Sequence, residues 1–379
     1  MDFDFERVID RRGGDSQKWN RYAGRDVLPL WIADMDFAAP PAVVAALERR
    51  IAHRVFGYGK PEASLVEAVL GYLRRRYAWR VEAEWLVWLP GLVTGLNAAC
   101  RAVDGDVLTA IPVYPPFLSA PRFAGRRLST APLALSGDAW GWDFTRLAAA
   151  VTPETRLFLF CHPHNPVGRA WRADELAELA EFCGRRDLIV CSDDIHCDLI
   201  LEPERPHVPL ATLDADMARR TITLMAPSKT YNIPGLACSL AIVPDATLRS
   251  RFSAVMRGIV PDVNILGLSA AEAAYRDCDA WRDALLGVLR ANRDLVETAV
   301  ARIPGLSMTH VEATYLAWID ARGLPVADPA LFFEEAGVGL SDGADFGAPG
   351  WVRLNFACPR ETLSAALLRM ATVCDKMNA

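Results

Sequence analysis

The chain lacks several features that would point to particular classes of protein. Its 379 residues contain no basic run, and a formal net charge of −6 with interspersed signs offers no basic face to nucleic acid. The acidic start, Met1-Asp2-Phe3-Asp4, is unlike an export signal. No apolar run reaches the roughly 18 residues that a membrane span needs. We therefore expect a cytoplasmic protein that binds neither nucleic acid nor membrane.

Cysteine pairs and metal-ligand patterns are also missing. The nine cysteines are scattered, and none forms a C-x-x-C pair. In a chain of this length without an export signal, reduced and mostly buried thiols are expected rather than disulfides or a zinc site. His162 and His164 could suggest a metal, but no carboxylate or further histidine stands beside them at ligand spacing. We expect no metal site.

What is present is a pattern of alternating strands and helices. With 52% hydrophobic and 23% charged residues, the chain can bury a sizeable core. Short apolar runs alternate with longer helical patterns, which predicts an α/β fold with a mostly parallel sheet flanked by helices and a smaller α+β domain. An amphipathic helix is expected over residues 172–185. The expected strands cover residues 107–111, 156–161, 188–192, 221–225 and 238–243.

The pattern changes after about Tyr275 and indicates a second, smaller domain. A long helical stretch runs to Ile303 and is followed by short strand-like and helical segments. These segments are strands over 315–319 and 351–356 and a last helix over 360–377. We expect a large domain over residues 51–275 and a small domain formed by residues 1–50 and 276–379.

Polar motifs follow three of the expected strands. They are His164-Asn165-Pro166, Ser192-Asp193-Asp194-Ile195-His196 and Pro227-Ser228-Lys229. In open α/β sheets, ligands bind at the carboxyl ends of the strands, where these motifs lie. A cofactor that withdraws electrons from Cα of an amino acid needs four groups from the protein. They are an amine that holds the cofactor, an acid at its ring nitrogen, hydrogen-bond donors at its phenolic oxygen and a cradle for its phosphate. The sequence offers a candidate for each.

The amine and the acid are assigned first. Lys229 would hold the cofactor covalently and, once freed by substrate, carry the Cα proton, because a buried ε-amine near a cation loses its proton readily. Asp193 would keep a pyridine nitrogen protonated. Asp194 is the competing acid, and a helix N-cap is the alternative role for either residue. Asn165 would donate to the phenolic oxygen, and His196 would lie beside it. The alternatives are that Asn165 only forms a turn before Pro166 and that His196 only packs in the core.

The remaining groups concern the phosphate, the ring and the substrate. A phosphate cradle is offered by amides at the positive end of a helix and by one hydroxyl: Gly91, Leu92, Val93 and Ser228. Tyr114 follows a strand, so its ring would either stack on the pyridine or pack in the core. Arg353 lies in a short expected strand, and its planar guanidinium suits bidentate capture of an amino acid's α-carboxylate.

These motifs, taken in chain order, resemble those of fold type I pyridoxal-phosphate enzymes of the class I/II aminotransferase family. The separation of 28 residues from Asn165 to Asp193, and of 36 from Asp193 to Lys229, is similar to the spacing in that family. The resemblance covers about residues 28 to 360. It implies pyridoxal 5'-phosphate as cofactor and a small amino acid as substrate.

Within the family, the chain looks like the cystathionine β-lyase, or C-S lyase, branch. The segments that carry this resemblance are 30–37, 56–59, 192–196 and 228–232. It implies β-elimination of cystathionine or a related cysteine S-conjugate to pyruvate, ammonia and a thiol. It also implies a homodimer in which Tyr58 reaches the phosphate of the neighbouring subunit and Ala33 lies beside the substrate carboxylate.

Departures from the family pattern leave alternatives open. Ala226 and Ala237 stand where the wider family often has a serine and an arginine, so phosphate affinity must rest on other donors. Asp194 stands where the branch more often has glutamate. One alternative is an aminotransferase that uses the same residues. Another is a regulatory binding protein that keeps the fold and holds a transcription factor, although intact Lys229 and Arg353 argue against a catalytically dead scaffold.

Overall fold

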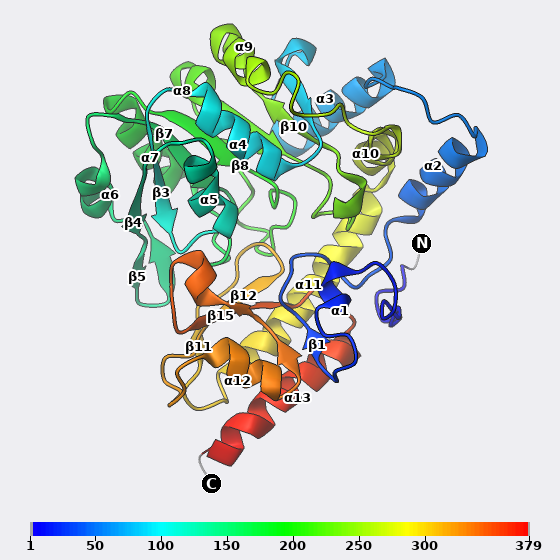
Figure 1. Ribbon diagram of the computed structural model, residues 1–379, viewed down its shortest axis with the longest axis vertical. Coiled ribbons are helices and arrows are strands. Elements are labelled where there is room, and N and C mark those ends of the chain that lie inside the picture. Colours follow the sequence, from blue (N-terminus) through cyan, green and yellow to red (C-terminus); the bar gives the residue numbers. More distant parts are fainter. Residues whose placement is uncertain (1–2, 378–379) are drawn as a thin grey trace.

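A seven-stranded sheet forms the centre of the computed structural model, which describes residues 3–377 (Figure 1). Its neighbouring strands from β9 to β4 all run parallel, whereas β10 is antiparallel to both β2 and β9. The predicted α/β fold with a mostly parallel sheet is confirmed. In order across the sheet, the strands are β2 (Leu86–Leu89), β10 (Ser239–Ile242), β9 (Thr221–Met225), β8 (Ile189–Asp193), β7 (Thr155–Cys161), β3 (Asp106–Ile111) and β4 (Leu128–Pro132).

The five strands expected from the sequence match β3, β7, β8, β9 and β10 to within one residue at each end. These are the inner strands, and most of their residues are buried. The sequence pattern did not predict β2 and β4, which form the two edges of the sheet. An edge strand keeps solvent on one side, so the apolar signal of β4 is weak: only one of its residues is buried.

Helices cover both faces of this sheet (Figure 1). On β7, Leu157 and Leu159 pack with one set of helices, while Phe158 and Phe160 pack with the other, because successive side chains of a strand point to opposite faces. The first face carries α4 (Leu92–Ala102), α5 (Pro115–Phe123) and α9 (Ala246–Ala254). The other face carries α6 (Phe144–Ala150), the predicted amphipathic α7 (Ala173–Arg185) and α8 (Ala215–Arg220).

A four-stranded antiparallel sheet lies below the large one (Figure 1). Its order is β11 (Ser307–Met308), β12 (Leu316–Asp320), β15 (Trp351–Asn355) and β14 (Ser341–Asp342). The long helical stretch of the prediction is α11 (Asp279–Val300), which directly follows α10 (Ile265–Asp277). The predicted last helix is α13 (Arg360–Met377). The elements expected after residue 303 are therefore confirmed.

The N-terminal part of the chain packs into the same core as the C-terminal part. Phe5, Leu30 and Phe37 share a hydrophobic cluster with Trp281 of α11 and Leu363 of α13. The short N-terminal elements are α1 (Gln17–Asn20) and β1 (Leu28–Pro29), and β1 pairs in parallel with β13 (Val338–Gly339) next to α12 (Pro329–Glu335). This shared core agrees with a small domain built from both ends of the chain, whose boundaries at residues 50 and 275 stay a prediction.

Thiols and apolar helices complete the description. All nine cysteines are buried, and none forms a disulfide. Across residues 3–377, no helix combines the length and the apolar character that crossing a bilayer requires. Within the same range, no group of three or more His, Cys, Asp or Glu side chains is arranged to hold a metal ion.

Candidate active site

The carboxyl ends of the parallel strands bring the predicted residues to one edge of the sheet. Asp193 is the last residue of β8 and pairs with Cys161, the last residue of β7. The loop after β7 carries Asn165, whose carbonyl accepts a hydrogen bond from the Tyr114 amide at 3.1 Å. The loop after β9 carries Lys229. Motifs that are far apart in the sequence thus meet because neighbouring parallel strands end at the same edge.

Lys229 has a partly buried amine that no carboxylate neutralises. Its Nζ donates to the Ala33 carbonyl at 2.5 Å, and it forms no ion pair with the residues that the structure describes. Burial lowers the pKa of Lys229 to about 8; Asp34 and Asp193 oppose this shift, and Arg353 adds to it. A substantial neutral fraction near pH 8 makes this amine a competent nucleophile and base.

Asp193 is buried and forms no ion pair within residues 3–377, although Lys229 lies close enough to oppose the rise in its pKa. Its Oδ1 accepts from the Ile195 amide at 3.1 Å, and burial raises the pKa of Asp193 to about 7, with Asp194 adding to the rise. Asp194, in contrast, accepts from Ser192 and lies 2.7 Å from His207 Nε2. Side chains of the protein therefore bind the Asp194 carboxylate, whereas the Asp193 carboxylate remains available to accept a hydrogen bond from a protonated group such as a ring nitrogen.

Arg353 is a second buried ion, and no described residue forms an ion pair with it. It lies on β15, is 4% exposed, and donates to Asn165 Oδ1 at 3.0 Å and to the Trp31 carbonyl at 2.8 Å. Its Nε has no partner among the described residues, and its guanidinium stacks over Phe346 at 4.6 Å. Burial lowers the pKa of Arg353 to about 10. A carboxylate ligand would supply the charge that the protein does not provide.

The start of α4 offers the backbone donors that the predicted phosphate cradle requires. The helix begins at Leu92, and its N-cap, Gly91, has no side chain to bond the first amides. The amides of Leu92 and Val93 therefore remain available at the positive end of the helix. Ser228 is 9% exposed, and its hydroxyl has no hydrogen-bond partner within the described range. These donors fit an anionic group, and none of them depends on the positions held by Ala226 and Ala237.

Three rings surround these charges. His196 is buried and meets Tyr315 edge-on with ring centroids 5.8 Å apart, and burial keeps the pKa of His196 well below its usual value, so the ring is neutral. Tyr114 is the N-cap of α5 and is partly buried. Sequence reasoning missed Tyr315, whose hydroxyl donates at 3.0 Å to the same Ala33 carbonyl that Lys229 contacts. Its place at the start of an expected strand gave no sign of this contact.

The loop over residues 31–37 has no strand or helix, yet side chains bind most of its carbonyls. Asn355 donates to two of them at 2.7 Å each, and Asn232 donates to two others at 2.7 and 3.0 Å. The Ala33 amide has no acceptor among residues 3–377. The carbonyls thus hold the loop from several sides, and the Ala33 amide is one of its N–H groups without an acceptor in the described range, which suits its predicted place beside a substrate carboxylate. The sequence analysis assigned no role to either asparagine.

Tyr58 is not gathered with the other predicted residues in the single chain. It lies in the connection between α2 (Pro41–Ala52) and α3 (Ala63–Tyr77), which runs along the outside of the molecule (Figure 1). Its side chain is fully exposed. Any contact of Tyr58 with a cofactor would have to be made outside this chain.

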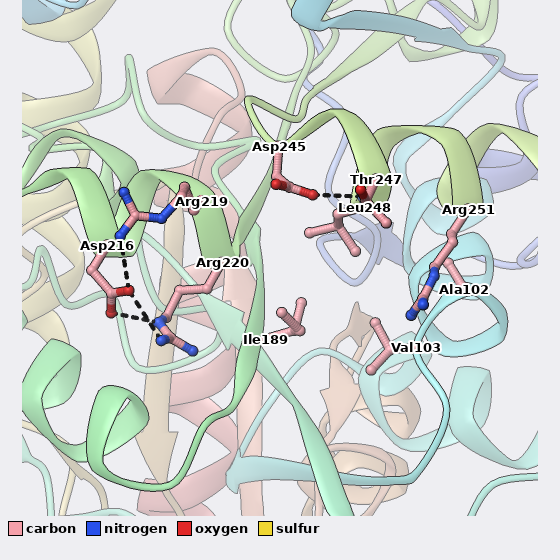
Figure 2. A pocket seen from close by; sticks show the side chains of 10 residues that line it. All are labelled: Ala102, Val103, Ile189, Asp216, Arg219, Arg220, Asp245, Thr247, Leu248 and Arg251. Atoms are coloured by element: carbon pink, nitrogen blue, oxygen red, sulfur yellow. Dashed lines mark hydrogen bonds and ion pairs between the residues drawn. The ribbon is translucent and has the colours of Figure 1, made fainter.

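A cavity of about 320 Å³ lies near the amino end of β8, away from these residues (Figure 2). Its charged groups are largely engaged with one another. Arg219 and Arg220 pair with Asp216 at 3.4 and 2.8 Å, and Asp245 accepts from the Leu248 amide at 2.7 Å. We therefore place the candidate site at the carboxyl ends of the strands, where buried charges lack partners.

Comparison with known proteins agrees with this geometry. Residues 25–370 match the family model for aminotransferase class I and II. The chain belongs to this family. It is 36% identical to cystathionine beta-lyase PatB from Bacillus subtilis, over 97% of this chain and 98% of that protein.

Solved structures of family members are also similar. The crystal structure of OvoB has a TM-score of 0.96 and 49% sequence identity, covering 98% of this chain and 99% of that one. Cystalysin from Treponema denticola, whose crystal structure contains pyridoxal 5'-phosphate, has a TM-score of 0.95 and 31% identity over 100% of both chains. The predicted family and its cystathionine β-lyase branch are confirmed, whereas the roles of individual site residues stay predictions.

Proposed function

We propose that this protein is a pyridoxal-phosphate-dependent lyase that eliminates a thiol from Cβ of cystathionine or a related cysteine S-conjugate, producing pyruvate and ammonia. One observation carries the proposal: Lys229 and Asp193 lie at the carboxyl ends of the parallel strands, Arg353 of β15 reaches the same place through its bond to Asn165, and none of the three forms an ion pair with a described residue. When bound, the cofactor supplies an electron sink for the pair released from the Cα–H bond. Similarity to PatB favours elimination over amino transfer.

The residues fit this cofactor group by group. The Lys229 amine would hold its aldehyde, and the Asp193 carboxylate would hold a proton on its ring nitrogen. Asn165 spends its Oδ1 on Arg353, so its Nδ2 is left to donate to the phenolic oxygen. Tyr114 and His196 would contact the ring. The phosphate would sit on the α4 amides of Gly91, Leu92 and Val93, with Ser228 adding its hydroxyl.

The substrate would be bound and deprotonated by the same set. Arg353 and the Ala33 amide bind the α-carboxylate, and Lys229 takes the proton from Cα. The electron pair from Cα forms the Cα=Cβ double bond, and the electron pair of the Cβ–S bond leaves with the thiolate. The released enamine reacts with water to give pyruvate and ammonia, so atoms and charge balance without an oxidant or a second substrate.

We also propose that the enzyme is a homodimer in which Tyr58 binds the phosphate of the partner subunit. Tyr58 and its neighbours Val55 and Phe56 are exposed apolar or aromatic side chains on one connection, which a second copy would cover. All nine thiols are buried and free of disulfides, which favours a reducing compartment such as the cytoplasm.

The decisive assay for the activity uses purified protein, pyridoxal 5'-phosphate and cystathionine without any keto acid acceptor. We expect a yellow chromophore and the release of pyruvate and free thiol in equal amounts. Turnover that occurs only after a keto acid is added would instead identify an aminotransferase.

A mixing experiment checks the placement of Tyr58. Loss of a hydrogen bond to a charged phosphate in Tyr58→Ala should raise the Kd of pyridoxal 5'-phosphate by about 10- to 100-fold. At limiting cofactor, equal amounts of Tyr58→Ala and Lys229→Ala protein, refolded together, should recover about one quarter of the wild-type activity, because half of the dimers then contain one intact site. Refolding the double variant alone is the control, and it should stay inactive. Absence of recovery in the mixture would place Tyr58 in its own site.

A further inference from the structure

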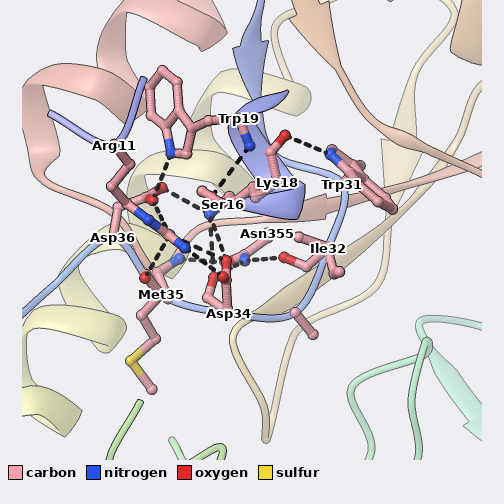
Figure 3. A network of polar contacts seen from close by, with 12 residues as sticks. Arg11, Ser16, Lys18, Trp19, Trp31, Ile32, Asp34, Met35, Asp36 and Asn355 are labelled. Carbon is pink, nitrogen blue, oxygen red and sulfur yellow. Dashed lines mark hydrogen bonds and ion pairs between the residues drawn. The ribbon is translucent and has the colours of Figure 1, made fainter. Parts of the chain in front are cut away.

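A buried network of ion pairs joins the N-terminal residues to the loop over residues 31–37 (Figure 3). Lys18, one of only four lysines in the chain, is 1% exposed. Its Nζ lies 2.7 Å from Asp36 Oδ2 and 3.5 Å from Asp34 Oδ1, and it donates to the Asp34 carbonyl at 3.1 Å. A lysine is therefore enclosed in the protein interior with two carboxylates.

Arg11 completes the charge balance of this network. Its Nη2 lies 2.7 Å from Asp34 Oδ2, and its Nη1 lies 2.7 Å from Asp36 Oδ1. Trp19 Nε1 also donates to Asp36 Oδ1 at 3.0 Å. Two cations face two carboxylates; Lys18 and Asp36 are buried, whereas Arg11 and Asp34 keep 24% and 21% of their side chains exposed. Removing Lys18 or Asp36 alone therefore leaves an uncompensated buried charge. The network consequently imposes a single geometry on the loop that carries both carboxylates.

The other side of this loop faces the candidate site. The Ala33 carbonyl, next to Asp34, accepts from Lys229 Nζ at 2.5 Å. The Trp31 carbonyl accepts from Arg353 Nη2 at 2.8 Å, and the Trp31 indole donates to the Lys18 carbonyl at 3.1 Å. The same short segment thus contacts the ion network on one side and the two cationic site residues on the other.

We propose that Lys18 and Arg11 are positioning residues: their ion pairs with Asp34 and Asp36 hold the Ala33 amide at the spacing from Arg353 that a substrate carboxylate requires. Neither residue touches the reacting atoms. The inference rests on the proposed function, because it concerns how the same site binds an amino acid. It goes beyond that function by assigning a role in substrate binding to the N-terminal segment.

The test replaces Lys18 by methionine, which keeps the length of the side chain and removes its charge. In cofactor-loaded Lys18→Met protein, we expect the Kd for sodium propionate, a carboxylate without an amine, to rise about 10- to 100-fold. KM for cystathionine should rise by a similar factor, while kcat and the cofactor content change much less. A general loss of structure would instead weaken propionate binding and lower kcat and the cofactor content together.

Arg25→Met is the matched control. Arg25 belongs to the same N-terminal segment, but it pairs at 2.7 Å with Glu334 on the surface, with 49% of its side chain exposed. Propionate binding should be unchanged in this variant. Without cofactor, amide hydrogen exchange of the peptide covering residues 31–37 should be faster in Lys18→Met and unchanged in Arg25→Met.

A second variant keeps the proposal testable if Lys18→Met does not fold. Lys18→Met/Asp36→Asn removes one charge of each sign and leaves the Arg11 pair with Asp34, so the protein should fold and still bind propionate weakly. Wild-type Kd and KM in a folded variant would overturn the positioning role. A wild-type protein that binds neither pyridoxal 5'-phosphate nor propionate would overturn the proposed function instead. In that case, the amide hydrogen exchange of residues 31–37 would still show whether Lys18 holds the loop in place.

Discussion

The Lys229→Ala variant is expected to lose at least about 10⁴-fold in kcat/KM for cystathionine, even with pyridoxal 5'-phosphate in excess. The change removes both the covalent holder of the cofactor and the base that takes the Cα proton. The loss corresponds to about 5 kcal/mol of transition-state stabilisation. No other lysine can replace Lys229, because Lys18 is enclosed in its ion network and both Lys60 and Lys376 are exposed.

Borohydride reduction followed by peptide mass mapping checks this prediction apart from activity. The wild-type protein should gain the reduced cofactor on the peptide that contains Lys229, and the Lys229→Ala protein should gain none. Lys376→Ala, a change at an exposed lysine in α13, is the control and should behave like the wild type. A label found only on another lysine, or normal turnover without Lys229, would contradict the assignment.

The Asp193→Asn variant should change activity and stability in opposite directions. A neutral amide cannot hold a proton on the ring nitrogen by a charge-assisted bond, so kcat should fall about 10²- to 10³-fold. The cofactor-free variant should nevertheless be more stable than the cofactor-free wild type at pH 8. The reason is that Asp193 is a buried carboxylate that forms no ion pair with the described residues, and burial outweighs the nearby Lys229 charge.

The pH dependence of this gain follows from the pKa of Asp193. Burial raises it from 3.8 to about 7 in the folded protein. Stability from this group is therefore fully present below pH 3.8, declines as the pH rises, and is lost once the pH passes about 7. Asparagine does not titrate, so the advantage of the variant should grow across this window to the order of 2–4 kcal/mol.

Denaturant unfolding of the cofactor-free proteins at pH 5 and pH 8 measures the effect. Asp36→Asn is the control with the opposite sign. Although burial acts to raise it, the pKa of Asp36 lies below its usual value because of Lys18, Trp19 and Arg11, so its carboxylate stabilises the protein above that range. This variant should be less stable than the wild type at pH 8. Equal stability of Asp193→Asn and the wild type at both pH values would contradict the prediction. It would show that the ionised Asp193 carboxylate does not destabilise the cofactor-free protein.

The parts of the fold that were predictable from the sequence are those with a strong local signal. Inner parallel strands are buried on both faces, so β7, β8 and β9 stand out as apolar runs. The edge strand β4 contains Ser129 and Thr130, and such polar residues hide a strand that has solvent on one side. The sequence pattern also did not predict α10, which ends just before the long helical stretch begins.

The sequence by itself determined which chemical groups the site contains. Asn165, Asp193 and Lys229 each follow or end a recognisable strand, and parallel strands place such residues at one edge whatever the rest of the chain does. Their identity and order were sufficient to predict the family. The sequence favoured Asp193 over Asp194 only through the family resemblance, because the two residues are adjacent and chemically alike.

Only the tertiary structure decided which of these groups are left without partners. His207 engages Asp194 and leaves Asp193 free, and Tyr315 joins Lys229 at a carbonyl that is 282 residues from one and 196 from the other. Contacts over such separations have no local signature, because they depend on how the two sheets pack. The free energy of a buried charge depends on the same packing, so its reactivity is a property of the folded chain.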